Sequence, residues 1–169
     1  MIFSYTEDGT GMTLIRPFAA LRPVAAHAAD VAAPPYDVMS RDEAKQMAAG
    51  RPWSFLHISR PEIDLPDEVD PYDDAVYTKG YHNLQQMQTA GILQQDTVPG
   101  YYVYRQTMAS HVQTGLVAVA SVQAYNTGRI KKHEFTRPVK EQDRVRQINC
   151  LNAQTGPVFL VYPAHTEVD

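Results

Sequence analysis

The residues of this sequence that are best suited to chemistry are concentrated in one stretch, "GRIKKHEFTRPVKEQDR", at 128–144. The stretch holds nine charged side chains and one histidine, and Glu134 follows His133 directly. Four cations lie close to this pair in the sequence: Arg129, Lys131, Lys132 and Arg137. Nearby positive charge favours the ionised form of a carboxyl group. An ionised Glu134 could accept a proton from a hydroxyl group during phosphoryl transfer, or hold Mg²⁺, while the cations contact phosphate oxygens.

A simpler interpretation of the same stretch is a surface strand whose charges face water and pair with those of neighbouring strands. Exposed pairs of this kind contribute roughly 0.2–1 kcal/mol each and need no ligand. On the residues alone, this structural interpretation is the stronger of the two. No histidine follows His133 at the spacing of a zinc helix, and the six histidines are scattered, so the sequence predicts no metal site. The phosphate-loop, dinucleotide-binding, H-E-x-x-H and C-x-x-C motifs are also absent from the sequence.

Two further candidates for ligand contacts lie nearer the N-terminus. In "APPYDV", two prolines stiffen the backbone and could hold Tyr36 and Asp37 in fixed positions. A packed turn with Tyr36 in the core explains the same residues equally well. Arg16 and Arg22 flank an apolar loop in "IRPFAALRP" and could bind phosphate or pair with the acidic loop at 62–70.

Two residues near the other end have plain structural explanations. Asp143, which precedes Arg144 in the first turns of the last predicted helix, suits the positive end of the helix dipole, and that alone could explain it. Cys150 is the single cysteine of the chain. It is interpreted as a small buried hydrophobic residue, because a catalytic thiol would need a nearby base and partial exposure.

The composition is that of an ordinary globular protein. The chain has 169 residues, 44% of them hydrophobic, which suits one domain with a core of its own. Its net charge of −4 argues against a general nucleic-acid coat protein. No apolar run approaches the length of a membrane span, and the first residues show no signal-peptide pattern. These features, with the single cysteine, predict a cytoplasmic protein without nucleic-acid or membrane partners.

Hydrophobic spacing and turn residues predict an α+β fold, a mixed sheet with flanking helices, because strands and helices alternate without a strict βαβ rhythm. Helices are predicted at 40–50, 72–93 and 140–154, the first opened by a capping box of Ser40 and Glu43. Strands are predicted at 53–59, 100–108, 115–125 and 157–163, and the last is expected to be central because it is almost entirely apolar. We expect a leader at 1–12 and a single domain at 13–169, the N-terminal portion of a longer protein.

Five motifs follow one another along the sequence: "RPFAALRP", "APPYDVMS", "GYYVYRQ", "YNTGRIKKHEFT" and "KEQDR". Together they resemble the start of a bacterial and archaeal family of uncharacterised proteins, catalogued as domain of unknown function 1015. The resemblance covers about residues 13–162, and the ordered set is specific although each motif alone is weak. Members of that family are usually much longer and carry a later "D-G-H-H-R" motif, which this sequence lacks. The resemblance therefore implies the N-terminal part of a longer protein, or a truncated member.

That later motif is similar to one in ParB-like proteins and in the free-serine kinases of the ParB/sulfiredoxin-like superfamily. The resemblance thus implies a ParB/sulfiredoxin-like fold. Those kinases use a glutamate in an "H-E" context as the base toward the serine hydroxyl. By this resemblance Glu134 would be the base, with His133 beside it.

These observations support three hypotheses of function. The first is part of a nucleotide-dependent kinase for a small hydroxyl-bearing metabolite, with ATP or ADP and Mg²⁺ as cofactors and Glu134 as base. In this hypothesis Lys131, Lys132 and Arg137 stabilise phosphate charge. The second is a non-catalytic module that binds a nucleotide or regulates a partner. The third is a structural domain whose charged segment packs against a further part of the protein.

Overall fold

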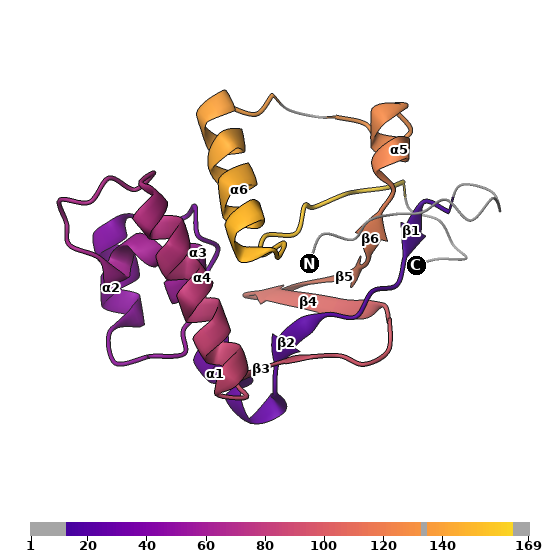
Figure 1. The fold of residues 1–169 in the computed structure, drawn as a ribbon. Coiled ribbons are helices and arrows are strands. Elements are labelled where there is room, and N and C mark those ends of the chain that lie inside the picture. The colour runs from indigo at the N-terminus through magenta and orange to yellow at the C-terminus, as the bar shows by residue number, and fades with distance from the viewer. Residues whose placement is uncertain (1–12, 133–134, 164–169) are drawn as a thin grey trace.

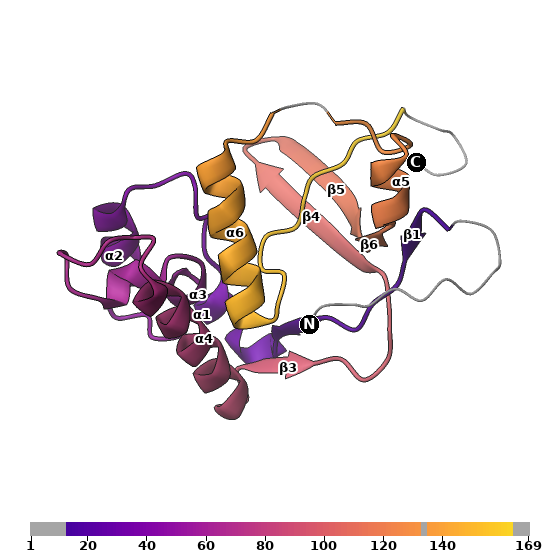
Figure 2. The same ribbon diagram turned by 45° about the horizontal axis from the view of Figure 1, so that its top comes forward.

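The computed structural model describes residues 13–132 and 135–163, and its fold is α+β, as predicted. Helices α1 to α4 gather on one side of the molecule, and most strands lie with α5 on the other, with α6 (Pro138–Leu151) between them (Figures 1 and 2). The other helices are α1 (Ala28–Val31), α2 (Arg41–Ala48), α3 (Leu56–Ser59), α4 (Asp74–Thr89) and α5 (Val122–Asn126), with 3-10 turns η1 (Ala25–His27) and η2 (Pro61–Asp64). No helix of the described part is long and apolar enough to cross a membrane.

The described strands form three separate antiparallel pairs instead of one larger sheet. The pairs are β1 (Ile15–Arg16) with β6 (Val119–Ala120), β2 (Leu21–Pro23) with β3 (Leu93–Gln95), and β4 (Tyr102–Met108) with β5 (His111–Val117). Strands β4 and β5 form a hairpin, and β4 lies within the strand predicted at 100–108. The turn of the hairpin is tight, because Ala109 adopts a positive φ of 53° and pairing continues up to Met108 and His111.

The capping box predicted for the first helix is present at the start of α2. The Glu43 backbone N–H donates to Ser40 Oγ at 3.3 Å, and the Ser40 backbone N–H donates to Glu43 Oε2 at 2.7 Å. These two bonds satisfy donors that a helix start would otherwise leave unpaired. The buried face of α2 packs against α3 and η2 in a small core: Ala44, Ala48, Leu56 and Ile63.

The long central helix predicted at 72–93 is confirmed as α4, with shorter limits. Asp73 caps it by accepting a hydrogen bond from the Ala75 N–H at 2.8 Å. The helix ends before Gly91, whose φ of 71° is a left-handed conformation that favours glycine. The main core forms around α4: Val31, Ile58, Leu84, Met87, Ile92, Leu93 and Leu151. Cys150 packs against this core partly buried, in line with its interpretation as a small hydrophobic residue.

Gly80 in the middle of α4 has a packing role that its sequence position did not reveal. A Cβ at this position would lie 2.8 Å from Pro61 Cγ and 3.5 Å from the Ile58 carbonyl oxygen. Glycine in a helix costs up to about 1 kcal/mol relative to alanine. Here it allows α4 to approach α3 and η2 more closely than any side chain would permit.

Three strand predictions are wrong. Residues 53–59 form a turn and the short helix α3, with Leu56 and Ile58 fully buried. A short apolar run does not distinguish a strand from a buried helical turn, and here the flanking prolines favour the turn. The second half of 115–125 becomes α5, which Ser121 caps through its side chain. Residues 157–163 form no strand, and Val158 is 75% exposed, so this segment is not central in a sheet.

Candidate functional site

Helix α6 brings together two motifs that are far apart in the sequence. Asp143 and Arg144 of "KEQDR" lie on α6, where it packs against α4 and against the loop that holds Tyr36 of "APPYDV". We call the side chains of Tyr36, Tyr77, Asp143 and Arg144 the Arg144 cluster. This cluster is the candidate functional site, because it combines a buried carboxylate with an oriented cation.

Asp143 is the buried centre of the Arg144 cluster. The residue is only 8% exposed, although it is charged. Its Oδ1 accepts a hydrogen bond from the Tyr77 hydroxyl at 2.8 Å. Its Oδ2 accepts from Arg144 through Nη2 at 2.7 Å and Nε at 3.2 Å. A buried carboxylate is stable only when it is paired and hydrogen-bonded, and both oxygens of Asp143 meet that condition.

Tyr77 serves this carboxylate as a fixed donor. Burial raises the pKa of Tyr77 to about 12, and the hydrogen bond to Asp143 adds to the rise. The hydroxyl therefore keeps its proton at neutral pH and does not act there as a base. Its role in the cluster is to hold one side of Asp143, which leaves the other side for Arg144.

Arg144 is held in one direction by Asp143 and by an aromatic ring. Its guanidinium carbon lies 4.3 Å from the centroid of the Tyr36 ring, a cation–π contact. The side chain remains 31% exposed, so it is held by the protein and still open to water. An arginine fixed in this way is suited to recognise carboxylate or phosphate, since its planar donor fork matches their geometry.

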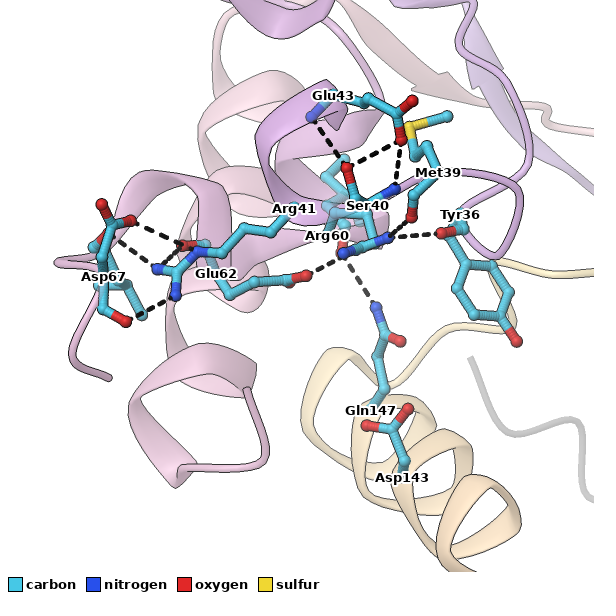
Figure 3. A network of polar contacts seen from close by, with 12 residues as sticks. Tyr36, Met39, Ser40, Arg41, Glu43, Arg60, Glu62, Asp67, Asp143 and Gln147 are labelled. Atoms are coloured by element: carbon cyan, nitrogen blue, oxygen red, sulfur yellow. Dashed lines mark hydrogen bonds and ion pairs between the residues drawn. The ribbon is translucent and has the colours of Figure 1, made fainter. Parts of the chain in front are cut away.

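The loop that carries Tyr36 is held by a second arginine, as Figure 3 shows. Arg60 Nη1 donates to the carbonyl oxygens of Tyr36 and Met39, each at 2.8 Å. Arg60 Nε also pairs with the buried Glu62 carboxylate at 2.5 Å. From α6, Gln147 Nε2 donates to the Ile58 carbonyl at 2.9 Å. These bonds tie the loop and α6 to the same framework, and thereby fix the ring on which Arg144 rests.

Other cations of α6 also lie over tyrosines. Lys140 Nζ lies 5.6 Å from the centroid of the Tyr72 ring, and Arg146 lies 4.4 Å from that of Tyr77. Arg146 Nη2 further pairs with Asp74 at 2.5 Å, at the start of α4. Lys140 lies one turn before Arg144 on α6, whereas the charge of Arg146 is paired with Asp74.

The two residues predicted as catalytic, His133 and Glu134, lie outside the described residues. The predicted cations around them are exposed. Lys132 Nζ lies 4.5 Å from the centroid of the Tyr125 ring on α5. Arg137 is the residue that precedes the first turn of α6, and its side chain makes no capping bond. Lys131 is exposed. These three cations thus lie on the segment that leads into α6.

The two N-terminal candidates lie in different places. Asp37 is exposed and adjoins Tyr36, so it borders the Arg144 cluster in the sequence. Arg16 is partly buried in β1, opposite Val119. Arg22 does not pair with the acidic loop as one hypothesis had it, but with Asp96, Nε to Oδ2 at 2.9 Å. The acidic loop is instead held by Arg41, which donates to the carbonyl oxygens of Glu62, Leu65, Pro66 and Asp67.

The sequence analysis did not assign Tyr77 or Arg60 to a site, and explained Asp143 by the helix dipole alone. Neither Tyr77 nor Arg60 lies in one of the five motifs, so their contacts with Asp143 and with the Tyr36 loop could not be predicted. The sequence indicated only that an aspartate stands next to an arginine in the "KEQDR" motif. Within the described residues, no group of three or more His, Cys, Asp or Glu side chains is placed to hold a metal ion.

Comparison with known proteins adds a family and no activity. A family model described as "Protein of unknown function (DUF1015)" matches residues 15–169. No curated protein and no solved structure matches the chain. The match includes both motifs of the Arg144 cluster. The ParB/sulfiredoxin-like fold that the resemblance implied stays a prediction.

Proposed function

This chain belongs to the DUF1015 family, and on that premise we propose that it forms the phosphate-binding part of a nucleotide-dependent phosphotransferase for a small hydroxyl-bearing metabolite. The observation that carries the proposal is the orientation of Arg144 by Asp143 and Tyr36. A cation that is already held in place loses little side-chain freedom when an anion binds, and preorganisation of this kind increases affinity.

The distribution of charge around α6 supports the same proposal. Lys140 lies one turn before Arg144 on the helix, and the segment that leads into α6 supplies three more exposed cations, Lys131, Lys132 and Arg137. Several cations close together in the sequence would suit a polyanion such as a nucleotide phosphate. The protein as a whole carries a net charge of −4, so this positive charge is local to one part of the sequence.

Glu134 has the role of base in the proposed reaction. Its carboxylate accepts the proton of the metabolite hydroxyl while the hydroxyl oxygen bonds to the transferred phosphorus. The bond from that phosphorus to the bridging oxygen breaks, and the nucleoside diphosphate leaves with the electron pair. ATP bound with Mg²⁺ would supply the phosphoryl group, and the cytoplasm, where we expect the protein, contains both. Asp37 and Arg16 are further candidate contacts for the two substrates.

The experiment that tests the proposal is calorimetric titration with ATP and with ADP, each with Mg²⁺. We expect Arg144→Gln to weaken binding about tenfold, since a charge-assisted bond to phosphate is lost, and Lys132→Ala to weaken it less. Glu134→Gln should leave nucleotide affinity unchanged and abolish phosphoryl transfer. Lys45→Gln is the matched control, because Lys45 pairs with Asp67 on a separate part of the helical region. If neither nucleotide binds the unmodified chain, the proposal fails.

A non-catalytic nucleotide-binding or regulatory module is the alternative within the same site. It predicts the same titration results for Arg144→Gln. It differs in the transfer reaction. The unmodified chain would move no phosphate to any hydroxyl-bearing metabolite, so Glu134→Gln would change neither nucleotide binding nor transfer. A screen of such metabolites with radiolabelled ATP separates the two functions.

A structural role in packing against a further protein segment is a second candidate function, and one observation favours it. Apolar side chains of the β4–β5 hairpin and of the segment after α6 are largely exposed: Val103, Met108, Leu116, Val158 and Val161. A two-stranded hairpin in water has little stability of its own, and packing against a partner would stabilise it. If another segment covers this surface, Val103→Thr with Leu116→Thr should change the free energy of unfolding of this chain by less than about 0.5 kcal/mol. A larger loss would mean that the surface already packs within the chain.

A further inference from the structure

A separate hollow lies on the helical side of the molecule, against the face of α4 that points away from Tyr77. It is open to water and has a volume of about 360 Å³. We call it the Trp53 hollow; the side chains that matter for its chemistry are Trp53, His57, Asp64, Lys79, Asn83 and Gln86. Three of these, Lys79, Asn83 and Gln86, come from α4 at i, i+4 and i+7, so they lie along one side of that helix.

One wall of the Trp53 hollow is a closed polar network. His57 Nδ1 lies 2.8 Å from Asp64 Oδ1, and Asn83 Nδ2 donates to Asp64 Oδ2 at 2.8 Å and to the His57 carbonyl at 2.6 Å. The other ring nitrogen of His57 lies 3.2 Å from the Arg51 carbonyl oxygen. Because both ring nitrogens face acceptors, the ring satisfies both contacts only as the doubly protonated imidazolium.

Two consequences follow for the charge of this wall. The imidazolium of His57 compensates the carboxylate of Asp64, so the pair presents little net charge to the hollow. His57 also has no free ring nitrogen, so it is not available there as a general base. The wall is therefore a rigid, nearly neutral support and not a catalytic pair.

The uncompensated charge in the Trp53 hollow comes from Lys79. Among the described residues, no hydrogen bond or ion pair engages its ammonium group. It is close enough to His57 and Asp64 that its positive charge acts to lower the pKa of both. Trp53 adds an indole N–H that donates to no group in the described part of the chain, and Gln86 adds an exposed amide. Three residues that carry donors of different kinds thus line one space.

A neighbouring hollow provides a useful contrast. It has a volume of about 200 Å³, lies on the other side of His57 and Asp64, and contains Lys45. The ammonium group of Lys45 already pairs with the Asp67 carboxylate. Of these two hollows, the Trp53 hollow is therefore the one whose lysine is available to a ligand.

We propose that the Trp53 hollow binds a small carboxylate that carries a flat apolar group. Lys79 would pair with the carboxylate, assisted by the indole N–H of Trp53, while the apolar group would rest against the Trp53 ring. A single cation beside the Asp64 carboxylate suits a monoanion, whereas a phosphate dianion would require further positive charge. This site is independent of the Arg144 cluster and of the proposed phosphotransferase function.

Trp53 makes the test direct, because it is the only tryptophan of the chain. The experiment is a titration of the whole chain with benzoate, followed by tryptophan fluorescence, with neutral benzamide as the matched ligand. We expect a saturable change in emission with benzoate and a much weaker response to benzamide. Lys79→Gln should weaken benzoate binding about tenfold, since the charged partner of the carboxylate is lost, and Lys79→Arg should retain it.

Lys45→Gln is the control variant, because Lys45 lines the neighbouring hollow without being free. Lys79 is on the helix surface, and its substitution is expected to leave folding intact, which circular dichroism verifies. The proposal is overturned if benzoate produces no saturable change in the unmodified chain. It is equally overturned if benzamide binds as tightly as benzoate, or if Lys79→Gln and Lys45→Gln bind benzoate alike.

Discussion

The guanidinium of Arg144 lies 4.3 Å from the centre of the Tyr36 ring, and the Asp143 carboxylate beside it fixes its direction. Through this contact the last helix of the described chain packs on a proline-stiffened loop near its start. The contact is part of the packing of α6, and its contribution to stability can be tested by substitution.

The ring of Tyr36 is expected to matter more than its hydroxyl. Tyr36→Phe keeps the aromatic face, so the free energy of unfolding should stay within about 0.5 kcal/mol of the unmodified value. Tyr36→Leu removes the cation–π contact and should cost about 0.5–2 kcal/mol. Urea denaturation followed by circular dichroism measures both. Equal losses in the two variants would show that the ring face is not what Arg144 uses.

Removal of the Asp143 carboxylate should be among the more damaging changes to the helix packing. In Asp143→Ala the Tyr77 hydroxyl loses its acceptor and Arg144 loses its partner, and the loss of such buried charged bonds costs about 3 kcal/mol. Asp143→Asn retains an acceptor for Tyr77 and should cost less. Asp42→Asn on the exposed side of α2 is the control. Thermal unfolding of the three variants provides the comparison, and an unchanged melting temperature in Asp143→Ala would contradict the assigned contacts.

Gly80→Ala tests the close approach of α4 to η2. In an open helix this change stabilises by up to about 1 kcal/mol. Here the new Cβ would meet Pro61 Cγ at 2.8 Å, so the expected result has the opposite sign, a loss of about 1–3 kcal/mol. Gly100→Ala, where the added Cβ meets no atom within 4 Å, should have little effect. A gain in stability for Gly80→Ala would mean that the helices are farther apart than described.

The pair of His57 and Asp64 predicts a defined dependence of stability on pH. The hydrogen bond to Asp64 raises the pKa of His57 above its ordinary 6.5, although burial opposes it. Burial acts to raise the pKa of Asp64, but the hydrogen bonds from His57 and Asn83 prevail and lower it below 3.8. The contribution of His57 to the stability of the fold is thus complete below pH 6.5, and it is lost as the pH rises through the raised pKa of His57. That of Asp64 is present above pH 3.8 and is lost as the pH falls through its lowered pKa.

The pair should therefore stabilise the fold most between about pH 4 and pH 6.5. The test is the free energy of unfolding of the unmodified chain and of His57→Gln, measured across pH 4 to 9. We expect the difference between them to be largest near pH 5–6 and to shrink above the raised pKa of His57. A difference that is constant over the whole range would show that His57 is not held as an imidazolium. His27→Gln is the control, since that histidine pairs with Asp30 at an exposed site.

The sequence predicted those parts of the fold that depend on neighbours in the chain. The capping box of Ser40 and Glu43 acts over a few residues, and it is present in the structure. The periodic apolar residues of α4 and α6 likewise predicted these helices, with errors at the ends. The apolar runs at 53–59 and 157–163 gave wrong strands, because four to seven apolar residues satisfy a buried turn or an exposed extended segment equally well.

The candidate site, like the fold, could be predicted from the sequence only in part. The residue types of the "APPYDV" and "KEQDR" motifs, and the family to which the chain belongs, were evident from the sequence alone. Only the tertiary structure placed Arg144 over Tyr36, gave Asp143 its bond from Tyr77, and left Lys79 without a hydrogen bond or ion pair to any described residue, in a hollow beside a paired histidine. The physical reason is range: capping and helical spacing act between near neighbours, whereas these contacts form only after packing of the core has closed loops spanning much of the chain.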